Sequence, residues 1–109
     1  MATLFKNVVV KNVGSQPVKV LETNGSTRTT VIGLSLTNLT SEFLYCSVML
    51  QDDTSVQGFY LKDTVLPANT SLRAVSTGEK FIVAPSNILY VQSSLDDSVD
   101  VILSYVEVT

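Results

Sequence analysis

Apolar and polar positions alternate along most of the chain in short runs, and no stretch keeps a helical period for three turns. Residues 28–38 show this most clearly, because Ile32, Leu34 and Leu36 recur at every second position with small or polar residues between them. A period of two places successive side chains on opposite faces of a strand. The pattern therefore predicts strands at residues 4–13, 18–22, 28–38, 43–51, 56–65, 71–75, 80–83, 87–93 and 98–108.

Turn-forming residues separate these runs at regular intervals. Asn24 and Gly25 form a two-residue hairpin signal because both tolerate positive φ, and Pro67 leads a later turn. Within residues 56–65, the apolar Phe59, Leu61 and Val65 are expected to share one face. We predict an all-β fold, an antiparallel β-sandwich (Ig-like or jelly-roll-like) of about eight or nine short strands. Residues 1–109 are expected to form a single domain.

The composition supports this class and excludes others. Val, Thr and Ile make up almost a third of the chain, and their branched side chains favour sheet over helix. With 45% hydrophobic and 16% charged residues, the chain is too apolar for a disordered protein. No run approaches the ~20 apolar residues of a membrane-spanning helix, and we expect no membrane partner.

Charge gives little sign of a nucleic-acid partner. The net charge is −3, and the seven Lys and Arg residues are scattered rather than clustered as a phosphate-binding surface requires. The N-terminus lacks the basic stretch and apolar core of a signal peptide, so we expect synthesis in a cytoplasm, followed by use there or by release from the cell inside a larger assembly. Three Asn-X-Ser/Thr sequons, at Asn24, Asn38 and Asn69, then indicate only turns rich in Asn, Ser and Thr.

The search for catalytic chemistry finds no candidate. The chain has no His, which removes Ser-His-Asp and Cys-His relays as well as His-based zinc sites. Cys46, the one cysteine, alternates with Leu44 and Val48, so we expect a buried structural thiol. We therefore expect a protein that is not an enzyme and that needs no cofactor.

Acidic residues gather in two of the predicted turns. In turns, Asp hydrogen-bonds nearby backbone groups, and this is the interpretation we favour. A Ca²⁺ site is the alternative if several of these carboxylates meet at one end of the sandwich. The residues concerned are Asp52, Asp53, Asp96, Asp97 and Asp100.

Several aromatic residues fall at positions that alternate with the expected core. If Leu44 and Cys46 face inward, then the residues between and beside them face solvent. Exposed apolar patches often mark interfaces, and the absence of Trp favours a protein partner over a stacked sugar. A slipped strand register is the plainer alternative. The candidate interface residues are Phe5, Phe43, Tyr45, Met49, Tyr60 and Tyr90.

One strand-and-turn pattern covers residues 30–38, 60–72, 78–83, 86–91 and 98–108. This pattern resembles the small β-sandwich virion proteins of tailed bacteriophages, including marine and cyanobacterial phages. The resemblance implies a non-enzymatic structural component of the head or tail and does not name the position. Our leading hypothesis is a capsid decoration (cement) protein that stabilises the shell through subunit contacts. A small tail or neck component and a host-glycan-binding module of a fibre are the alternatives. The implied partners are the major capsid protein or tail and neck proteins, in a homo-oligomer or multi-copy assembly. Residues 1–22 match less clearly and are expected to form an assembly contact of their own.

Overall fold

The computed structural model describes residues 2–75 and 78–109. Within these residues it contains nine strands, and no helix is long and apolar enough to cross a membrane. The ends of the strands agree with the sequence prediction to within one residue. The strands are β1 (Thr3–Val13), β2 (Val18–Glu22), β3 (Arg28–Asn38), β4 (Leu44–Gln51), β5 (Gln57–Leu66), β6 (Ser71–Val75), β7 (Phe81–Val83), β8 (Ile88–Ser93) and β9 (Val99–Val108).

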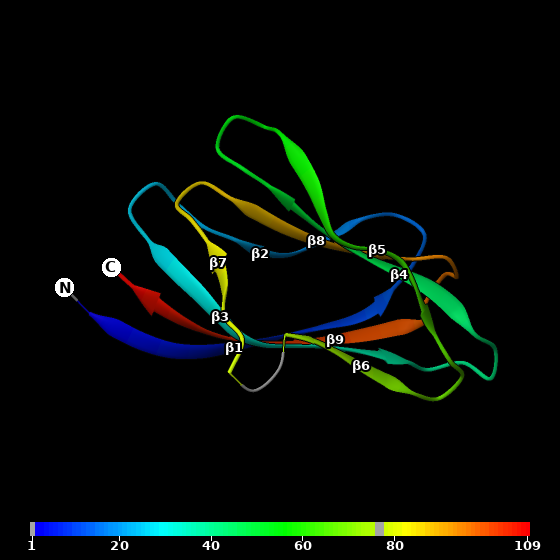
Figure 1. Ribbon diagram of the computed structural model, residues 1–109. Coiled ribbons are helices and arrows are strands. Elements are labelled where there is room, and N and C mark those ends of the chain that lie inside the picture. Colours follow the sequence, from blue (N-terminus) through cyan, green and yellow to red (C-terminus); the bar gives the residue numbers. More distant parts are fainter. Residues whose placement is uncertain (1, 76–77) are drawn as a thin grey trace.

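The strands form two antiparallel sheets, so the predicted β-sandwich is confirmed. One sheet has the order β1-β9-β3-β6, with β7 also paired to β3, and the other has the order β2-β8-β4-β5. Early strands pair with late ones in nested fashion: β4 with β5, β3 with β6, β2 with β8 and β1 with β9. Of the two architectures considered, this is the jelly roll. Figure 1 shows the two layers, with both chain ends at the same end of the molecule.

The core lies between the two sheets and consists mainly of Leu and Val. Leu34, Leu36, Leu89 and Leu103 are fully buried there, contributed by strands of both sheets. Cys46 lies among them, as predicted, and burial raises the pKa of its thiol to about 11. A thiol held protonated in this way acts as a small apolar side chain.

The face assignment predicted for β3 is wrong at Ile32. The pairing of β3 with β9 shifts register between Val31 and Gly33, which marks a β-bulge. The bulge turns Val31 into the core together with Leu34, and it leaves Ile32 42% exposed on the opposite face.

The face assignment predicted for β5 is also wrong. Two register shifts against β4 insert extra residues into β5 on either side of Leu61. Leu61 pairs with the buried Val48 and packs against the core. Phe59 and Val65 instead lie on the exposed side of the sheet.

One of the three sequons is a buried structural anchor. The Asn38 side-chain amide donates hydrogen bonds to the carbonyl oxygens of Glu42 (2.8 Å), Leu66 (3.1 Å) and Pro67 (3.1 Å). Its oxygen accepts from the backbone N–H and the hydroxyl of Thr40, both at 2.8 Å. Asn38 therefore joins the β3–β4 loop to the end of β5.

Candidate interaction surfaces

The outer side of the sheet that contains β1 and β9 carries a row of residues across four strands, and three of the four are apolar. Phe5 pairs with Val106, Val106 with Thr30, and Thr30 with Ile82. Directly opposed residues of antiparallel strands project from the same face, so these side chains form one row. Phe5, at the outer strand, is 78% exposed.

A second row crosses the same sheet further along the strands. Val9 pairs with Ile102, and Ile102 with Ser35. Between the two rows lie small and polar residues, and a shallow pocket of about 160 Å³ beside Ile102 is lined in part by Gly33 and Ser104. We call the exposed apolar side chains of this sheet face A: Phe5, Val9, Ile32, Ile82 and Ile102.

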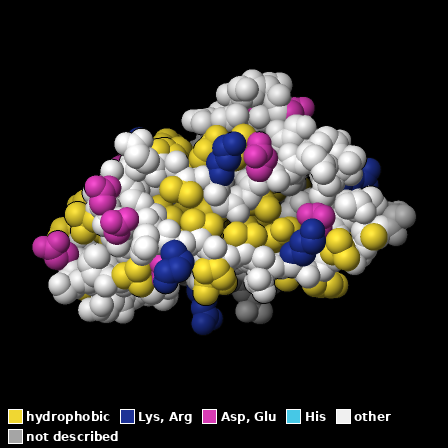
Figure 2. Space-filling view, turned by 180° about the vertical axis from the view of Figure 1, so that it is seen from behind, with side chains coloured by type: hydrophobic (Ala, Val, Ile, Leu, Met, Phe, Trp, Pro, Cys, Tyr) yellow, Lys and Arg dark blue, Asp and Glu magenta, His cyan; other side chains and the backbone are white. Residues whose placement is uncertain are grey.

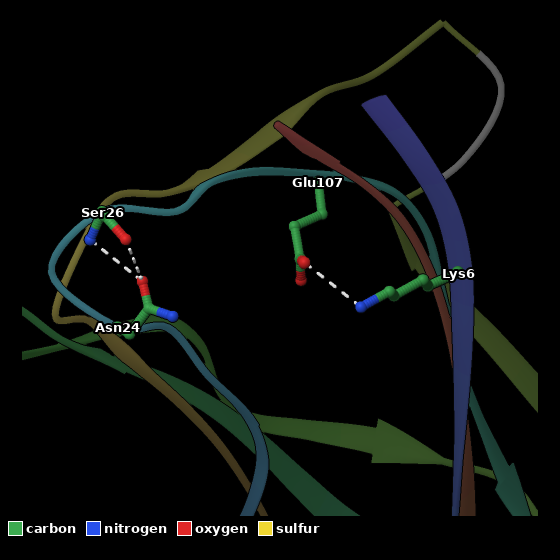
Figure 3. A network of polar contacts seen from close by, with 4 residues as sticks. All are labelled: Lys6, Asn24, Ser26 and Glu107. Atoms are coloured by element: carbon green, nitrogen blue, oxygen red, sulfur yellow. Dashed lines mark hydrogen bonds and ion pairs between the residues drawn. The ribbon is translucent and has the colours of Figure 1, made fainter. Parts of the chain in front are cut away.

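Basic side chains near β1 are paired with acidic ones. The Lys6 ammonium lies 3.1 Å from a Glu107 carboxylate oxygen, and the two side chains point toward each other from β1 and β9 (Figure 3). Lys11 and Asp100 form a second pair at 3.5 Å. Figure 2 shows neighbouring basic and acidic side chains interrupting a broken band of hydrophobic ones. Lys6 alternates with Phe5, and Glu107 pairs with the buried Thr29, so this first pair lies on the inner side of the sheet. Asp100 alternates with the buried Val99 and Val101, so the second pair lies on the outer side. At both places each basic side chain is paired with an acidic one, which is not the clustered positive charge that nucleic acid requires.

The outer side of the other sheet carries a second exposed apolar group. The rings of Phe43 and Tyr45 meet edge to face with centroids 5.8 Å apart, and Tyr45 pairs with Val65 of β5. The Lys62 ammonium lies 5.1 Å from the centroid of the Phe59 ring, within cation–π range. We call this group face B: the exposed Phe43, Tyr45, Phe59 and Val65, with the half-buried Tyr90 beside Met49.

Met49, predicted to be exposed with Phe43 and Tyr45, is buried at 8% exposure. It lies outside the core cluster, and it pairs with Phe59 on one side and Tyr90 on the other. Its side chain therefore projects to the outer side of the sheet, where its larger neighbours cover it. The alternation predicted the direction of Met49 but not the cover given by the adjacent strands.

Tyr60 joins the two sheets. Its ring packs on that of Phe81 with centroids 4.6 Å apart, and its hydroxyl donates a hydrogen bond to the carbonyl oxygen of Ala74 at 3.2 Å. Tyr60 and Phe81, with Phe59 and Val56, line a pocket of about 340 Å³ along the β4–β5 hairpin, which extends beyond the sandwich in Figure 1. Tyr60 thus has a role inside the fold as well as an exposed edge.

The turn aspartates act mainly as hydrogen-bond acceptors for loops. Asp52 accepts from the N–H and the hydroxyl of Thr54 (2.9 and 2.7 Å) and from the N–H of Val56 (3.0 Å), which lowers its pKa. Asp96 accepts from the hydroxyl (2.7 Å) and the N–H (3.0 Å) of Ser15 in a different loop. Among the described residues no three acidic or thiol groups come together as a metal-binding group.

The sequence pattern missed most of face A. Phe5 was identified, but Val9, Ile32, Ile82 and Ile102 were not. Val9 has an apolar neighbour on each side in the sequence, so alternation alone does not show which face of β1 is exposed there. These residues are brought together by the pairing of β1 with β9 and of β3 with β7, which aligns them across strands. Knowledge of that pairing would have identified them.

No protein-family model and no curated protein matches the chain. Solved structures share its fold at low identity. A chain of the Bacillus endospore appendages, described as disulfide-linked pili, has a TM-score of 0.59 and 8% identity over 98% of this chain and 88% of that one. A chain of the T13 IBDV viral particle has a TM-score of 0.54 and 9% identity over 96% of this chain and 30% of that one.

A chain of the infectious bursal disease virus VP2 subviral particle has a TM-score of 0.50 and 8% identity, over 96% of this chain and 37% of that one. This chain thus spans about a third of the length of either viral chain. At such identities the likeness establishes the sandwich fold alone. The fold is one that viral particle and pilus subunits use.

Proposed function

We propose that the chain is a non-enzymatic structural protein of a bacteriophage virion, and specifically a capsid decoration protein that binds the outer surface of the shell. Face A carries the proposal. It presents five large apolar side chains on the solvent side of one sheet. Covering such a surface with another protein removes apolar area from water, which favours binding.

The other observations support the same function. Face B offers a second apolar surface on the opposite side of the sandwich, so one copy can contact two neighbours at once. Viral particle chains are among the proteins with a similar fold, although the fold alone does not assign function. A decoration protein acts by burying area across neighbouring subunits, which requires no catalytic residue.

The test is to locate and count the protein in purified particles by electron microscopy. For a direct measurement, particles that lack the protein are mixed with recombinant chain and sedimented. The double variant Val9→Thr/Ile102→Thr keeps strand-favouring side chains but makes face A more polar, and we expect it to lose at least tenfold in particle affinity.

The matched control is Val56→Thr, because Val56 in the β4–β5 hairpin is 63% exposed and Val9 is 61% exposed. We expect this variant to bind like the unmodified chain. Absence of the protein from particles would overturn the proposal. If the protein is present in particles but the double variant binds as well as the unmodified chain, the contact does not involve face A. The electron-microscopy density would then show whether the protein has a tail or neck position.

A host-glycan-binding module is the second candidate, and one pocket favours it. This pocket, of about 270 Å³, is lined by the exposed Tyr45 together with the Ser47 hydroxyl, the Asp63 carboxylate and the Gln92 amide. An aromatic platform next to hydrogen-bonding groups suits a sugar ring. Binding of the isolated chain to host polysaccharide, abolished by Tyr45→Ala, would favour this function over shell decoration.

A further inference from the structure

Each sheet has two edges, and three of the four edges carry features that hinder pairing with another chain. The edge next to β3 is formed by the short β6 and β7, of five and three residues. Strand β2 has five residues and a register shift. Strand β5 has two register shifts and a positive φ of 47° at Asp63. Short, bulged and bent edges are the usual protection against edge-to-edge pairing.

Strand β1 lacks these features over most of its length. It has eleven residues, and its register against β9 runs unbroken from Thr3 to Val10. Its one central charge, on Lys6, is paired with Glu107 of the neighbouring strand. This edge is therefore long, regular and largely apolar, which is the kind that another strand extends.

The hydrogen bonds within the sheet determine which groups of β1 are free. The N–H of Thr109 donates to the carbonyl oxygen of Ala2 at 3.0 Å, so Ala2 is a residue whose backbone bonds point toward β9. Antiparallel pairs alternate between hydrogen-bonded and non-hydrogen-bonded, so every second residue of β1 also points toward β9. The residues between them direct their N–H and C=O groups to the open edge: Thr3, Phe5, Asn7 and Val9.

These free groups match a second copy of the same strand. When two β1 strands run antiparallel about a two-fold axis at Asn7, Phe5 lies opposite the partner's Val9 and Leu4 opposite the partner's Val10. Lys6 then lies opposite the partner's Val8, and every hydrogen-bonded pair joins two residues with free backbone groups.

Neighbouring registers fit less well. Moving the axis to Lys6 places this lysine opposite the partner's Lys6, and like charges directly opposed destabilise a sheet. Moving the axis to Val8 places Phe5 opposite the partner's Lys11 and removes the pairing of Phe5 with Val9. Charge and apolar complementarity thus select the register centred on Asn7.

We propose that two copies of this chain pair through the β1 edge, about a two-fold axis at Asn7. The pairing joins the two five-stranded sheets into one continuous sheet and makes face A continuous across both copies. A two-fold contact of this kind closes on itself, so it gives a dimer rather than a filament. The inference concerns the isolated chain, and its failure would leave the particle experiment unaffected.

The first test measures the mass of the chain in solution by light scattering after gel filtration. We expect twice 11.8 kDa for the unmodified chain and 11.8 kDa for Asn7→Pro. Proline removes an N–H that points to the open edge, and edge strands tolerate it because the bonds to β9 come from other residues. Asn7→Lys, which opposes two like charges on the axis, is the second variant and should also give the single-chain mass.

The second test is disulfide trapping with Asn7→Cys. Opposed residues of a hydrogen-bonded pair lie about 5.5 Å apart between Cα atoms, which is within disulfide range. We expect a cross-linked dimer on mild oxidation. The control, Val9→Cys, would lie about 13 Å from its counterpart in this register and should not cross-link. A monomer at high concentration would overturn the proposal, as would a dimer that both Asn7→Pro and Asn7→Lys leave intact.

Discussion

Two buried threonines differ in what their hydroxyl groups bind. Thr23, 8% exposed, donates from its hydroxyl to the carbonyl oxygen of Ala84 (2.6 Å) and accepts from the N–H of Asn87 (3.0 Å). Thr29, 2% exposed, has a side-chain oxygen with no partner among the described residues. A buried hydroxyl without a hydrogen bond lowers stability, whereas a satisfied one contributes to it. The same residue type therefore has opposite effects at the two positions.

We predict that Thr29→Val raises the free energy of unfolding by about 1 kcal/mol, because valine keeps the shape and removes the unpaired hydroxyl. The matched control Thr23→Val should lower it by about 1–3 kcal/mol, because the Ala84 carbonyl and the Asn87 N–H both lose a partner. Urea denaturation of both variants measures the difference. Destabilisation by Thr29→Val would mean that its hydroxyl is satisfied in solution.

Asp96 gives a prediction about pH. The hydroxyl of Ser15, and then its N–H, lower the pKa of this carboxyl below 3.8 by bonding its ionised form. A lowered folded-state pKa means that the stabilisation is complete above the unfolded-state pKa and is lost as pH falls through the folded-state value. We therefore expect Asp96→Asn to be less stable than the unmodified chain near neutral pH. The difference should shrink on acidification below about 3.8.

Melting temperatures across an acid titration measure this effect. The control is Asp53→Asn, which removes an exposed carboxylate from a different turn and tests whether the loss of any turn carboxylate has the same effect. A constant gap between Asp96→Asn and the unmodified chain at all pH values would show that the ionisation of Asp96 does not contribute to stability.

At the scale of the elements, the positions of the strands follow from the sequence, but the faces of β3 at Ile32 and of β5 do not. Turn residues and alternation are local, and they located all nine strands. The bulges at Ile32 and around Leu61 depend on how a strand aligns with its partner, which no local pattern contains. The same limit applies to the candidate surfaces. Tyr45 was found from its own strand, whereas Ile82 and Ile102 join face A only through pairing across the sheet.

The bulge in β3 gives a prediction about two residues that the alternation treated as equivalent. Leu34→Ala should lower the free energy of unfolding by about 2–5 kcal/mol, because it leaves a cavity in the core. Ile32→Ala should change it by less than about 1 kcal/mol, because the Ile32 side chain lies on the exposed side of the bulge. Chemical denaturation of the two variants decides the matter. A large loss with Ile32→Ala would indicate that this residue faces the core.

At the scale of the whole molecule, the nested pairing makes the strand pairs unequal in the loops they close. The β4–β5 pair joins Gln51 to Gln57 across a short turn, whereas the β1–β9 pair joins Thr3 to Val108. Loop-closure entropy rises with the length of the loop, so the inner pair forms at the lowest cost. We infer that folding begins around β4 and β5 and that β1 docks last, at the ms-to-s rates of folds with mostly non-local contacts.

Val48 in β4 and Val13 in β1 allow this order to be tested with matched changes, since both are fully buried valines. Each valine-to-alanine substitution should lower the free energy of unfolding by about 1–3 kcal/mol. A change of this size can be divided reliably between the folding rate and the unfolding rate. We expect Val48→Ala to slow refolding, because its contacts form before the rate-limiting step. Val13→Ala should instead speed unfolding and leave the refolding rate nearly unchanged. Stopped-flow measurements over a range of urea concentrations give both rates, and the reverse pattern would mean that closing the β1–β9 pair limits folding.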